Sequence, residues 1–427
     1  MSKFVKLKDL CIKITDGSHF SPKGIDVGIP MLSVKDMREN CFDYSDCKKI
    51  SQEDYEVLCS NGCHPEVNDI VIAKDGSYLK QVFVIKEDIK QAVLSSIGIL
   101  KPDLTKVNPY YIKYYLSSDF VKNEVAKKYV SGSALPRIIL KGFANIEIPY
   151  IDKKLQDKLI SILKNIDDKI ANNNKTNAQL EEMAKTIYDY WFLQFEFPNE
   201  EGKAYKSSGG KMVWNDELKR EIPEGWKIGQ LSDISQIIMG SSPKGESLNE
   251  NNEGIIFYQG KTDFGKRFPT VRMYTNKPIR YAEVNSILLS VRAPVGDINI
   301  TNKKCCIGRG LAAISGKYQS FLFYHMLANK YQFDKYNNSG TTFGALTKDN
   351  LYEMKIIIPE EKIIRNFNNL VKKYDDLIKK NFEENCTLEE MRDFLLPLLM
   401  NGQVKFKDTL KDEIAYKEVE EKESTLI

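Results

Sequence analysis

The stretch Leu180-Glu181-Glu182-Met183 decides the architecture of this chain, because the same four residues return 208 positions later as Leu388-Glu389-Glu390-Met391. Working outward from this pair, four further matches appear in the same order along the chain. They pair Ser21-Pro22-Lys23-Gly24 with Ser242-Pro243-Lys244-Gly245, Glu66-Val67-Asn68 with Glu283-Val284-Asn285, Ser131-Gly132-Ser133 with Ser339-Gly340-Thr341, and Ile148-Pro149 with Ile358-Pro359. Five ordered matches indicate an internal duplication in which loops of different length shift the offset.

Both copies of the Leu-Glu-Glu-Met motif lie in long segments whose apolar residues recur every three or four positions, which is typical of a coiled-coil seam. The seam residues are Leu159, Ile162, Ile166, Leu180, Met183, Ile187 and Tyr190 in the first segment, and Phe367, Leu370, Tyr374, Leu377, Leu388, Met391, Leu395 and Leu398 in the second. About 40 residues at 1.5 Å per residue would form a helix roughly 60 Å long. An amphipathic helix lying on an ordinary core is the alternative interpretation.

The middle of each seam is polar, with Asn173 and Asn381 in equivalent positions close to the midpoint of each segment. If the helices pair antiparallel, the two midpoints meet, and a buried Asn at a seam commonly fixes the register. We therefore predict an Asn173–Asn381 contact, with a solvated gap as the alternative. The full set assigned to helix pairing is Asn173, Leu180, Met183, Asn381, Leu388 and Met391.

The sequence predicts a mixed α+β protein in which two similar α/β domains are separated by two long antiparallel coiled-coil helices with pseudo-twofold symmetry. Short β-branched and aromatic runs broken by Gly, Pro, Asn and Asp indicate strands in each globular part. Residues 198–226 are rich in Gly, Ser, Lys and Glu, which predicts an exposed linker. The charged C-terminal residues 403–427 are predicted to form a solvated tail. The expected boundaries are 1–150 for the first domain, 151–197 for the central helix, 198–226 for the linker, 227–359 for the second domain, 360–402 for the C-terminal helix and 403–427 for the tail.

Composition excludes several classes of protein. No apolar run approaches the roughly 20 residues that span a bilayer, and residues Met1 to Leu10 contain no hydrophobic signal region, so we expect a cytoplasmic protein. The chain has eight cysteines and no Cys-x-x-Cys pair, which favours free thiols over a disulfide framework. Cys41, Cys47, Cys59 and Cys63, with His64, do not follow a usual zinc spacing, and whether they bind a metal stays open.

The sequence shows no catalytic motif. Gly260-Lys261-Thr262 resembles the end of a phosphate-binding loop, but five residues separate its glycines where that loop needs four. Asn108-Pro109-Tyr110-Tyr111 resembles an amino-methyltransferase site but lacks its second proline, and it more naturally begins a helix. The three histidines have no spacing that suggests a triad or a metalloenzyme. A duplicated chain without a catalytic motif favours binding; a self-contained S-adenosylmethionine-dependent DNA methyltransferase and a duplicated scaffold that binds no nucleic acid are the alternatives.

Polar and basic residues recur at matching positions of the two globular parts, where Lys, Arg, Ser and Thr side chains contact phosphates and base edges. The first part offers Ser21, Lys23, Lys35, Lys74, Ser77, Lys80, Ser133, Arg137 and Lys141, and the second offers Ser242, Lys244, Lys261, Arg267, Arg292, Arg309, Thr341, Thr342 and Lys348. Two similar domains on a rigid spacer are suited to two separated half-sites on one duplex. The net charge of +3 is low for a chain that must hold DNA alone, so either the basic residues gather on one face or partners add contacts.

These motifs carry a resemblance to a known family. The chain up to about residue 400 resembles the specificity subunit of type I restriction–modification systems, through the paired Ser-Pro-Lys-Gly turns, the Glu-Val-Asn motifs and the Leu-Glu-Glu-Met helices. The run from Phe197 through Ser207-Ser208-Gly209-Gly210-Lys211-Met212-Val213-Trp214 to Ile222-Pro223-Glu224-Gly225-Trp226 is especially characteristic.

The resemblance implies a division of labour. Each globular part would be a target recognition domain that reads one half of a bipartite, asymmetric DNA sequence. The helices would act as the spacer and as the docking site for two modification (methyltransferase) subunits, which use S-adenosylmethionine. A restriction subunit would add ATP- and Mg-dependent translocation and cleavage. The chain itself would be non-catalytic and would bind no cofactor and no metal.

Overall fold

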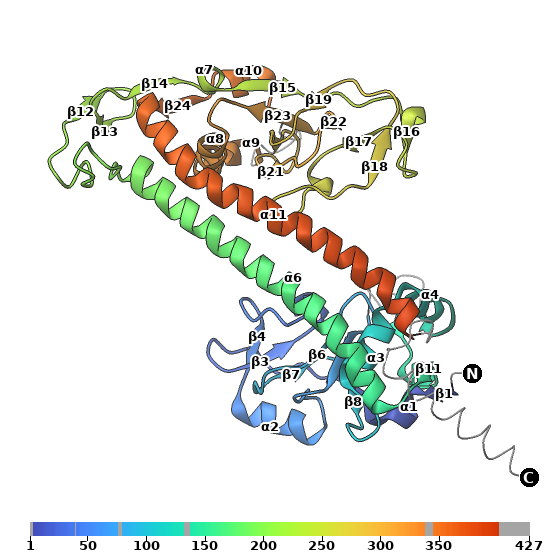
Figure 1. Ribbon diagram of the computed structural model, residues 1–427. Coiled ribbons are helices and arrows are strands. Elements are labelled where there is room, and N and C mark those ends of the chain that lie inside the picture. The colour runs from blue at the N-terminus through green and yellow to red at the C-terminus, as the bar shows by residue number, and fades with distance from the viewer. Residues whose placement is uncertain (1–2, 39, 76–78, 132–136, 338–344, 401–427) are drawn as a thin grey trace, which may run out of the picture. The chain divides into compact units, whose positions relative to one another are not determined.

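The computed structural model describes residues 3–38, 40–75, 79–131, 137–337 and 345–400, and the chain divides into two compact units (Figure 1). Unit 1 comprises residues 1–171 and 385–427, and unit 2 comprises residues 172–384. The expected tail, 403–427, lies outside the described residues.

Two long helices dominate the fold. Helix α6 spans Lys153–Tyr188 and continues as a short π-helix over Asp189–Leu193, and helix α11 spans Glu361–Met400. Helix α6 begins in unit 1 and ends in unit 2, whereas α11 begins in unit 2 and ends in unit 1. The chain is thus a mixed α/β protein with two long helices, as the sequence predicted.

Each long helix ends with apolar side chains buried in a core. At the end of α6, Tyr188 and Phe192 belong to the hydrophobic core of unit 2, and Trp191 packs against it. At the end of α11, Leu396, Leu399 and Met400 belong to the core of unit 1. These two sets of three lie 208 positions apart, which is the offset of the Leu-Glu-Glu-Met repeat, so the duplication extends to the way each helix ends.

Within unit 2, the two helices contact each other along antiparallel directions. Tyr188 packs edge-on against Phe367, the amide of Asn381 donates to Asn177 Oδ1 at 2.8 Å, and the amide of Asn173 donates to Glu384 Oε2 at 2.8 Å. In this series of contacts the residue numbers decrease along α6 while they increase along α11, so the two helices run antiparallel here. Asn173 and Asn381 therefore face the opposite helix, but each of these amides donates to a residue about one turn from the partner that the sequence predicted.

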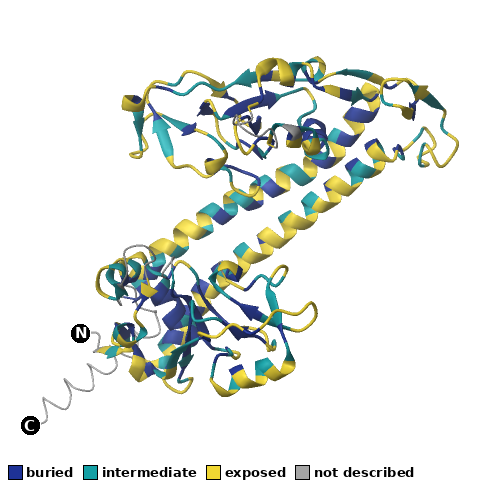
Figure 2. Cartoon of the chain, turned by 180° about the vertical axis from the view of Figure 1, so that it is seen from behind, coloured by how far each residue is buried: buried dark blue, intermediate teal, exposed yellow. Residues whose placement is uncertain are grey.

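Buried and exposed positions alternate along both long helices (Figure 2). The buried positions differ in part from the predicted seam. Met183 and Met391 are 50% and 51% exposed, so the structure does not support their assignment to helix pairing, while Leu180 and Leu388 are partly buried. The buried position one residue further along α6 is Ala184. Apolar spacing alone could not separate the two sides because the apolar residues cover more than one helix face.

Unit 1 contains β-sheets covered by short helices. Its strands are β1 (Lys3–Lys6), β2 (Cys11–Asp16), β3 (Ile29–Leu32), β4 (Lys48–Ile50), β5 (Ile70–Ala73), β6 (Val82–Val84), β7 (Ala92–Val93), β8 (Ile97–Pro102), β9 (Val130–Ser131), β10 (Arg137–Ile138) and β11 (Glu147–Tyr150). Its shorter helices are α1 (Leu7–Leu10), η1 (Val34–Asp36), α2 (Gln52–Ser60), α3 (Pro109–Ser117), α4 (Asp119–Lys128) and α5 (Leu140–Phe143). Helix α3 begins with Asn108 as its cap and Pro109 at its first turn, as the sequence indicated.

Unit 2 has a corresponding set of elements. Its strands are β12 (Met212–Asn215), β13 (Arg220–Pro223), β14 (Lys227–Gln230), β15 (Gln236–Met239), β16 (Leu248–Asn249), β17 (Ile255–Tyr258), β18 (Met273–Thr275), β19 (Tyr281–Ala282), β20 (Ile287–Ser290), β21 (Ile298–Ile300), β22 (Cys305–Ile307), β23 (Leu311–Ser315) and β24 (Lys355–Ile358). Its shorter helices are α7 (Leu231–Ile234), η3 (Gly245–Ser247), η4 (Lys261–Asp263), α8 (Gln319–Ala328), η5 (Lys330–Phe333), α9 (Asp334–Asn337) and α10 (Lys348–Tyr352).

The sheet orders of the two units correspond over much of each unit, although the sheet that contains β17 has two further strands, β16 and β19, at its edges. Unit 1 has a four-stranded sheet in the order β2-β8-β5-β6, and unit 2 has β15-β23-β20-β21. The pair β1-β11 corresponds to β14-β24, and the order β4-β3-β7 corresponds to β18-β17-β22. In both of these last sheets the middle strand pairs antiparallel with one neighbour and parallel with the other.

The Glu-Val-Asn motifs form the same turn in both units. Asn68 and Asn285 have left-handed backbones, with φ of 74° and 68°, a conformation that Asn tolerates better than most residues. The next residue in each motif donates its N–H to the motif's glutamate carbonyl, at 2.9 Å from Asp69 to Glu66 and 3.0 Å from Ser286 to Glu283. The turn directs the chain into the buried strands β5 and β20.

A close backbone approach precedes each Ser-Pro-Lys-Gly turn. A Cβ on Gly17 would lie 2.1 Å from the Val93 carbonyl oxygen, and one on Gly240 would lie 2.1 Å from that of Gly308. Only glycine fits at these two positions. The prolines that follow, Pro22 and Pro243, are both buried, so the turn is anchored on both sides while its lysine stays exposed.

Residues 198–226 are exposed or partly exposed up to residue 221, as the composition suggested, but they contain regular structure and end in buried residues. Strands β12 and β13 form an antiparallel hairpin, and Ile222 and Trp226 are buried in the core of unit 2. Phe197 stacks on Trp226 with ring centroids 5.3 Å apart. Apolar residues scattered through the Gly-, Ser- and Lys-rich stretch anchor it.

We predict that Gly240→Ala destabilises the protein by roughly 1–3 kcal/mol, because the new methyl group must displace a backbone carbonyl in a packed region. Gly245→Ala in the same turn is the matched control, since no atom lies within 4 Å of its added Cβ. The control should stay within about 0.5 kcal/mol of the wild type. Thermal unfolding of both variants measures this, and equal stabilities would contradict the close approach.

Candidate nucleic-acid interface

In unit 1, several loops leave one end of the four-stranded sheet. Asp16 at the end of β2 pairs with Gly98, and Ala73 at the end of β5 pairs with Ile97. The segments 17–28, 74–81 and 94–96 therefore start or finish at this end. The N–H of Ile138 donates to the Lys74 carbonyl at 3.0 Å, which brings the segment from β10 to the same place. We call this set of segments the loop end of unit 1.

Unit 2 has the equivalent loop end. Met239 pairs with Ala312, and Ser290 pairs with Leu311, so segments 240–247, 291–297 and 308–310 gather there. The N–H of Leu346 donates to the Val291 carbonyl at 2.9 Å, as that of Ile138 does to Lys74. The N–H of Arg309 donates to Ser242 Oγ at 3.1 Å, which ties two of these segments together.

Most of the predicted binding residues of unit 1 are exposed at or near its loop end. Ser21 accepts a hydrogen bond from Lys48 Nζ at 2.8 Å, and Lys23 in the same turn is exposed. Lys35 is exposed on η1, beside the segment 94–96, because the N–H of Val34 donates to Ser96 Oγ at 3.4 Å. Arg137 pairs with Asp75 at 2.8 Å and is half exposed. Lys80 and Lys141 are exposed as well.

Unit 2 places its predicted residues similarly. Lys244, Arg292, Arg309 and Lys348 are exposed, and Ser242 is partly buried. Lys261 is exposed on η4 but forms an ion pair with Asp297, which Lys330 also contacts at 2.6 Å. Burial acts to raise the pKa of Asp297, but the two lysines outweigh it and lower that pKa, so the carboxylate is ionised at neutral pH.

Four predicted residues, Ser77, Ser133, Thr341 and Thr342, lie outside the described residues.

Lys74 is a correction to the sequence prediction. Its side chain is only 4% exposed and forms an ion pair with Asp16, so it does not present a charge to a ligand. The Lys74 carbonyl accepts from the N–H of Ile138, and in unit 2 the carbonyl that accepts the equivalent bond, from Leu346, is that of Val291. Lys74 therefore corresponds to the buried Val291, not to Arg292. The true counterpart of Arg292 is therefore Asp75, and the two loop ends carry opposite charges at this position.

Arg267 is a second correction. Its side chain is 5% exposed, and its guanidinium contacts Asp375 at 2.5 Å and Glu181 at 3.2 Å on the two long helices. It also lies over the Phe323 ring at 4.4 Å. A basic residue in a loop-like sequence is here an internal contact of unit 2.

Sequence reasoning missed Phe20, which is 68% exposed in the loop end of unit 1. Its backbone is held by Ser18, whose hydroxyl accepts from the Phe20 N–H at 3.1 Å and donates to its carbonyl at 2.6 Å. Ser18 is itself hydrogen-bonded to Val93. The available signal was the insertion of His19 and Phe20 between Gly17-Ser18 and the Ser-Pro-Lys-Gly turn, which the second copy lacks.

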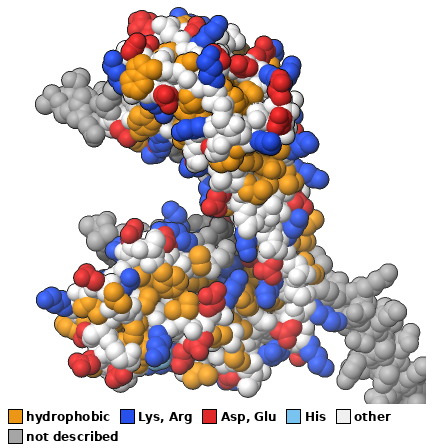
Figure 3. All heavy atoms as spheres, turned by 90° about the vertical axis from the view of Figure 1, so that its left-hand side faces the viewer, with side chains coloured by type: hydrophobic (Ala, Val, Ile, Leu, Met, Phe, Trp, Pro, Cys, Tyr) orange, Lys and Arg blue, Asp and Glu red, His pale blue; other side chains and the backbone are white. Residues whose placement is uncertain are grey.

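Charges on the surface are mixed. On the face drawn in Figure 3, Lys and Arg side chains lie among Asp and Glu in each unit rather than in one continuous basic patch. This agrees with the net charge of +3. Within the described part of the chain, no group of three or more His, Cys, Asp and Glu side chains is arranged to hold a metal ion, and this includes the described cysteines 41, 47, 59 and 63. Among the described helices, none is both long and apolar enough to cross a bilayer.

Comparison with known proteins agrees with this geometry. Residues 2–182 and 223–384 match the type I restriction modification DNA specificity domain. The chain is 30% identical over 421 residues to a putative type I restriction enzyme MjaX specificity subunit of Methanocaldococcus jannaschii, covering 94% of this chain and 93% of that protein. It is 24% identical to the HindI specificity subunit of Haemophilus influenzae, covering 77% and 84% of the two chains.

The fold has a counterpart among solved structures. The S subunit of a type I restriction–modification system from M. genitalium matches with a TM-score of 0.58 at 15% identity, covering 93% of this chain and 96% of that one. Together with the matched domain and the full-length relatives, this shows that the chain belongs to the type I restriction–modification specificity subunits, the non-catalytic DNA-recognition components of those systems.

Proposed function

We propose that the two loop ends read the two halves of a bipartite, asymmetric DNA sequence. The observation that carries this proposal is the strand-by-strand correspondence of the two four-stranded sheets, which present different side chains on loops that leave equivalent ends. Asp75 stands where Arg292 stands, and Phe20 has no counterpart. A shared frame with different loops is the arrangement expected for two related readers with different targets.

The residues proposed to contact DNA are polar or charged and are at least partly exposed. They are Ser21, Lys23, Lys35, Lys80, Arg137, Lys141, Ser242, Lys244, Lys261, Arg292, Arg309 and Lys348, with Ser77, Ser133, Thr341 and Thr342 proposed on sequence alone. Arg side chains can bind guanine edges bidentately, whereas the lysines suit phosphates as point charges.

We take residues 1–150 and 227–359 as the two target recognition domains and the segments 151–197 and 360–402 as spacer helices. These segments would form an antiparallel coiled coil with pseudo-twofold symmetry. The antiparallel contacts within unit 2, between Asn177 and Asn381 and between Asn173 and Glu384, support this arrangement. In this scheme the helix length sets the gap between the half-sites.

The proposed partners are double-stranded DNA and two methyltransferase subunits, which would carry S-adenosylmethionine. A restriction subunit with ATP and Mg would complete the system, and the chain would work in the cytoplasm. The modest net charge supports a role for partners, because the chain alone offers few uncompensated cations for the phosphate backbone.

Methylation mapping of DNA from cells with and without this protein tests the proposed function. We expect a motif of two half-sites with a fixed gap that disappears when the protein is removed. Replacing residues 227–359 with the corresponding domain of a relative should change one half of the motif and leave the other unchanged. A continuous motif, or a change in both halves, would contradict the proposal.

We predict that Arg292→Gln weakens DNA binding and makes the plot of log affinity against log salt shallower by about 0.9, because one fewer counterion is released. The matched control is Lys355→Gln. Lys355 lies on β24, where it pairs with Glu217. Strand β24 pairs with β14, which leads through α7 to the start of β15. The loop end lies at the other end of β15, so Lys355 is at the opposite end of the sheet from it. The control should leave the slope unchanged; a binding titration at several salt concentrations measures both.

We predict that Phe20→Ala relaxes base preference at one or two positions in the half-site that unit 1 reads, by about tenfold, because an apolar contact with a base is lost. The other half-site should keep its sequence. Phe4→Ala is the control, since Phe4 is also exposed but lies on β1, which leads to the start of β2, away from the loop end. Methylation mapping with each variant gives the answer, and an unchanged motif with Phe20→Ala would remove Phe20 from the interface.

A further inference from the structure

Each long helix carries an aspartate that a tyrosine of the adjoining globular part contacts. Asp167 on α6 accepts a hydrogen bond from the Tyr114 hydroxyl at 2.6 Å, and Asp375 on α11 accepts one from the Tyr324 hydroxyl at 3.3 Å. The two aspartates lie 208 positions apart, at the repeat offset. The tyrosines lie on α3 and α8, the helices that follow strands β8 and β23. The duplication therefore preserves one acid–tyrosine contact in each unit.

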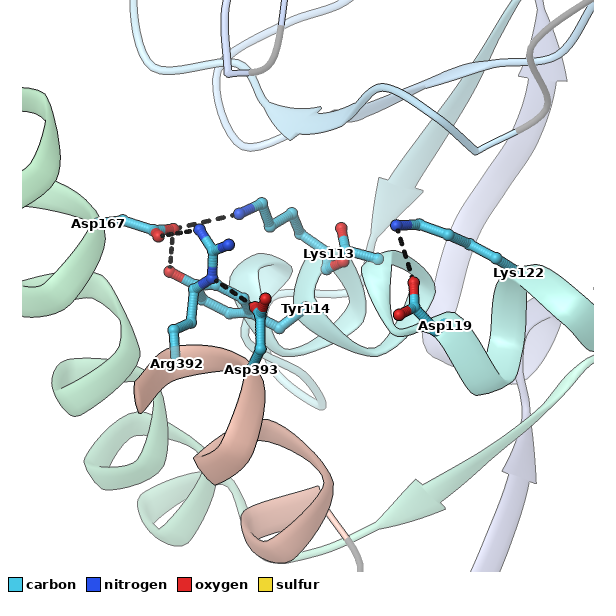
Figure 4. A network of polar contacts seen from close by, with 8 residues as sticks. Lys113, Tyr114, Asp119, Lys122, Asp167, Arg392 and Asp393 are labelled. Atoms are coloured by element: carbon cyan, nitrogen blue, oxygen red, sulfur yellow. Dashed lines mark hydrogen bonds and ion pairs between the residues drawn. The ribbon is translucent and has the colours of Figure 1, made fainter. Parts of the chain in front are cut away.

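The cations around the two aspartates come from different elements. In unit 1, Lys113 Nζ lies 3.2 Å and an Arg392 nitrogen 3.1 Å from the Asp167 carboxylate, so α3 and α11 both converge on it (Figure 4). In unit 2, Arg267 from the segment after η4 contacts Asp375 and donates to the Tyr324 hydroxyl at 3.2 Å. The position equivalent to Arg392 in the repeat is Ala184, which is buried and uncharged.

These clusters are buried and charged, so their geometry is restrictive. Burial acts to raise the pKa of Asp167, but Lys113 and the hydrogen bonds from Tyr114 and Arg392 outweigh it, and that pKa is lowered. Burial and the neighbouring Asp167 raise the pKa of Tyr114, so its hydroxyl stays a neutral donor. In unit 2 the Arg267–Asp375 pair joins the globular part to α11, whereas in unit 1 Lys113 and Tyr114 join it to α6 and Arg392 joins α11 to α6. Hydrogen bonds to a carboxylate are directional, whereas apolar surfaces can slide, so each cluster restricts the angle of the globular part on its helix.

We propose that Asp167 and Asp375 are positioning residues, each fixing the angle between its recognition domain and the helices, and thereby limiting the number of base pairs accepted between the half-sites. This inference rests on the proposed function of reading two half-sites. One base pair more or less moves a half-site by about 3.4 Å and turns it by roughly 35° about the duplex axis. A domain held at one angle rejects that change, whereas a loosely held domain accepts it.

The test introduces Asp375→Asn into the full-length protein, in cells that contain its partner subunits, and maps DNA methylation. Asp376→Asn is the matched control, because Asp376 is 65% exposed and pairs with Lys372 of its own helix at 2.8 Å. Tyr324→Phe is the gentler second variant, since it removes one hydroxyl and keeps every charge. For unit 1, Asp167→Asn with Asp168→Asn as its control repeats the design.

We expect the wild type and both controls to methylate targets with one gap length. Asp375→Asn and Asp167→Asn should also methylate targets one base pair longer or shorter, with the preference for the original gap falling roughly tenfold or more. Tyr324→Phe should give a smaller change in the same direction. The bases of both half-sites should stay the same, which separates a positioning role from loss of folding or of base contacts.

Three outcomes would overturn the inference. One is an unchanged gap preference in Asp375→Asn, Asp167→Asn and Tyr324→Phe while methylation persists. Another is altered half-site bases at the original gap. A third is loss of methylation in both aspartate variants together with an unchanged gap in Tyr324→Phe. A wild-type motif without two half-sites would instead remove the proposed function itself, and the inference with it.

Discussion

The structure depends on the burial of each long helix's last turns in a core. Tyr188, Trp191 and Phe192 at the end of α6 pack in the core of unit 2, and the core of unit 1 takes in the end of α11. Burying several large apolar side chains is worth several kcal/mol on each side. Unit 1 completes its core with the end of α11, which lies more than 200 residues further along the chain than the rest of that core. Unit 2 is one continuous stretch, residues 172–384, and its core includes the end of α6, which belongs to the first copy of the repeat. The duplicated sequence thus builds two units that each require both halves of the chain.

The polar contacts along the helices add direction to this apolar burial. Asn177 and Asn381 bond across the helices of unit 2, and a buried amide left without its partner is costly, so the pair resists a slip along the helix. The aspartate clusters act in the same way between a helix and the sheet-bearing part of its unit. Apolar burial supplies most of the stability, whereas directional bonds select one register and one angle.

The sequence predicted features that recur in both copies and missed those that belong to one. The Glu-Val-Asn motifs, the Ser-Pro-Lys-Gly turns and the long helices were found because their residues recur in both copies. The Glu-Val-Asn turn and the long helix also form in both units. Lys74 and Arg267 were wrongly assigned to the DNA interface. The sequence does not distinguish a basic residue that is exposed to solvent from one that pairs with a buried carboxylate. The hairpin in 198–226 was missed because its apolar anchors are diluted by Gly, Ser and Lys. Burial depends on contacts between distant residues, which one sequence does not show.

The two units share the same four-stranded sheet but differ in the loops at its end. This difference explains how one fold can present different surfaces to DNA. Gly17 and Gly240 are required by the same close approach, and the buried Pro22 and Pro243 anchor the same turn, so substitution there disturbs the sheet. The neighbouring positions differ between the copies: Asp75 is mostly buried and pairs with Arg137, whereas its counterpart Arg292 is exposed. Phe20 is inserted without shifting Pro22 from its buried position. A change in these loops alters hydrogen-bonding and apolar groups at the surface but leaves the core contacts in place. The proposed DNA contacts can therefore differ between the two units while each keeps the same four-stranded sheet.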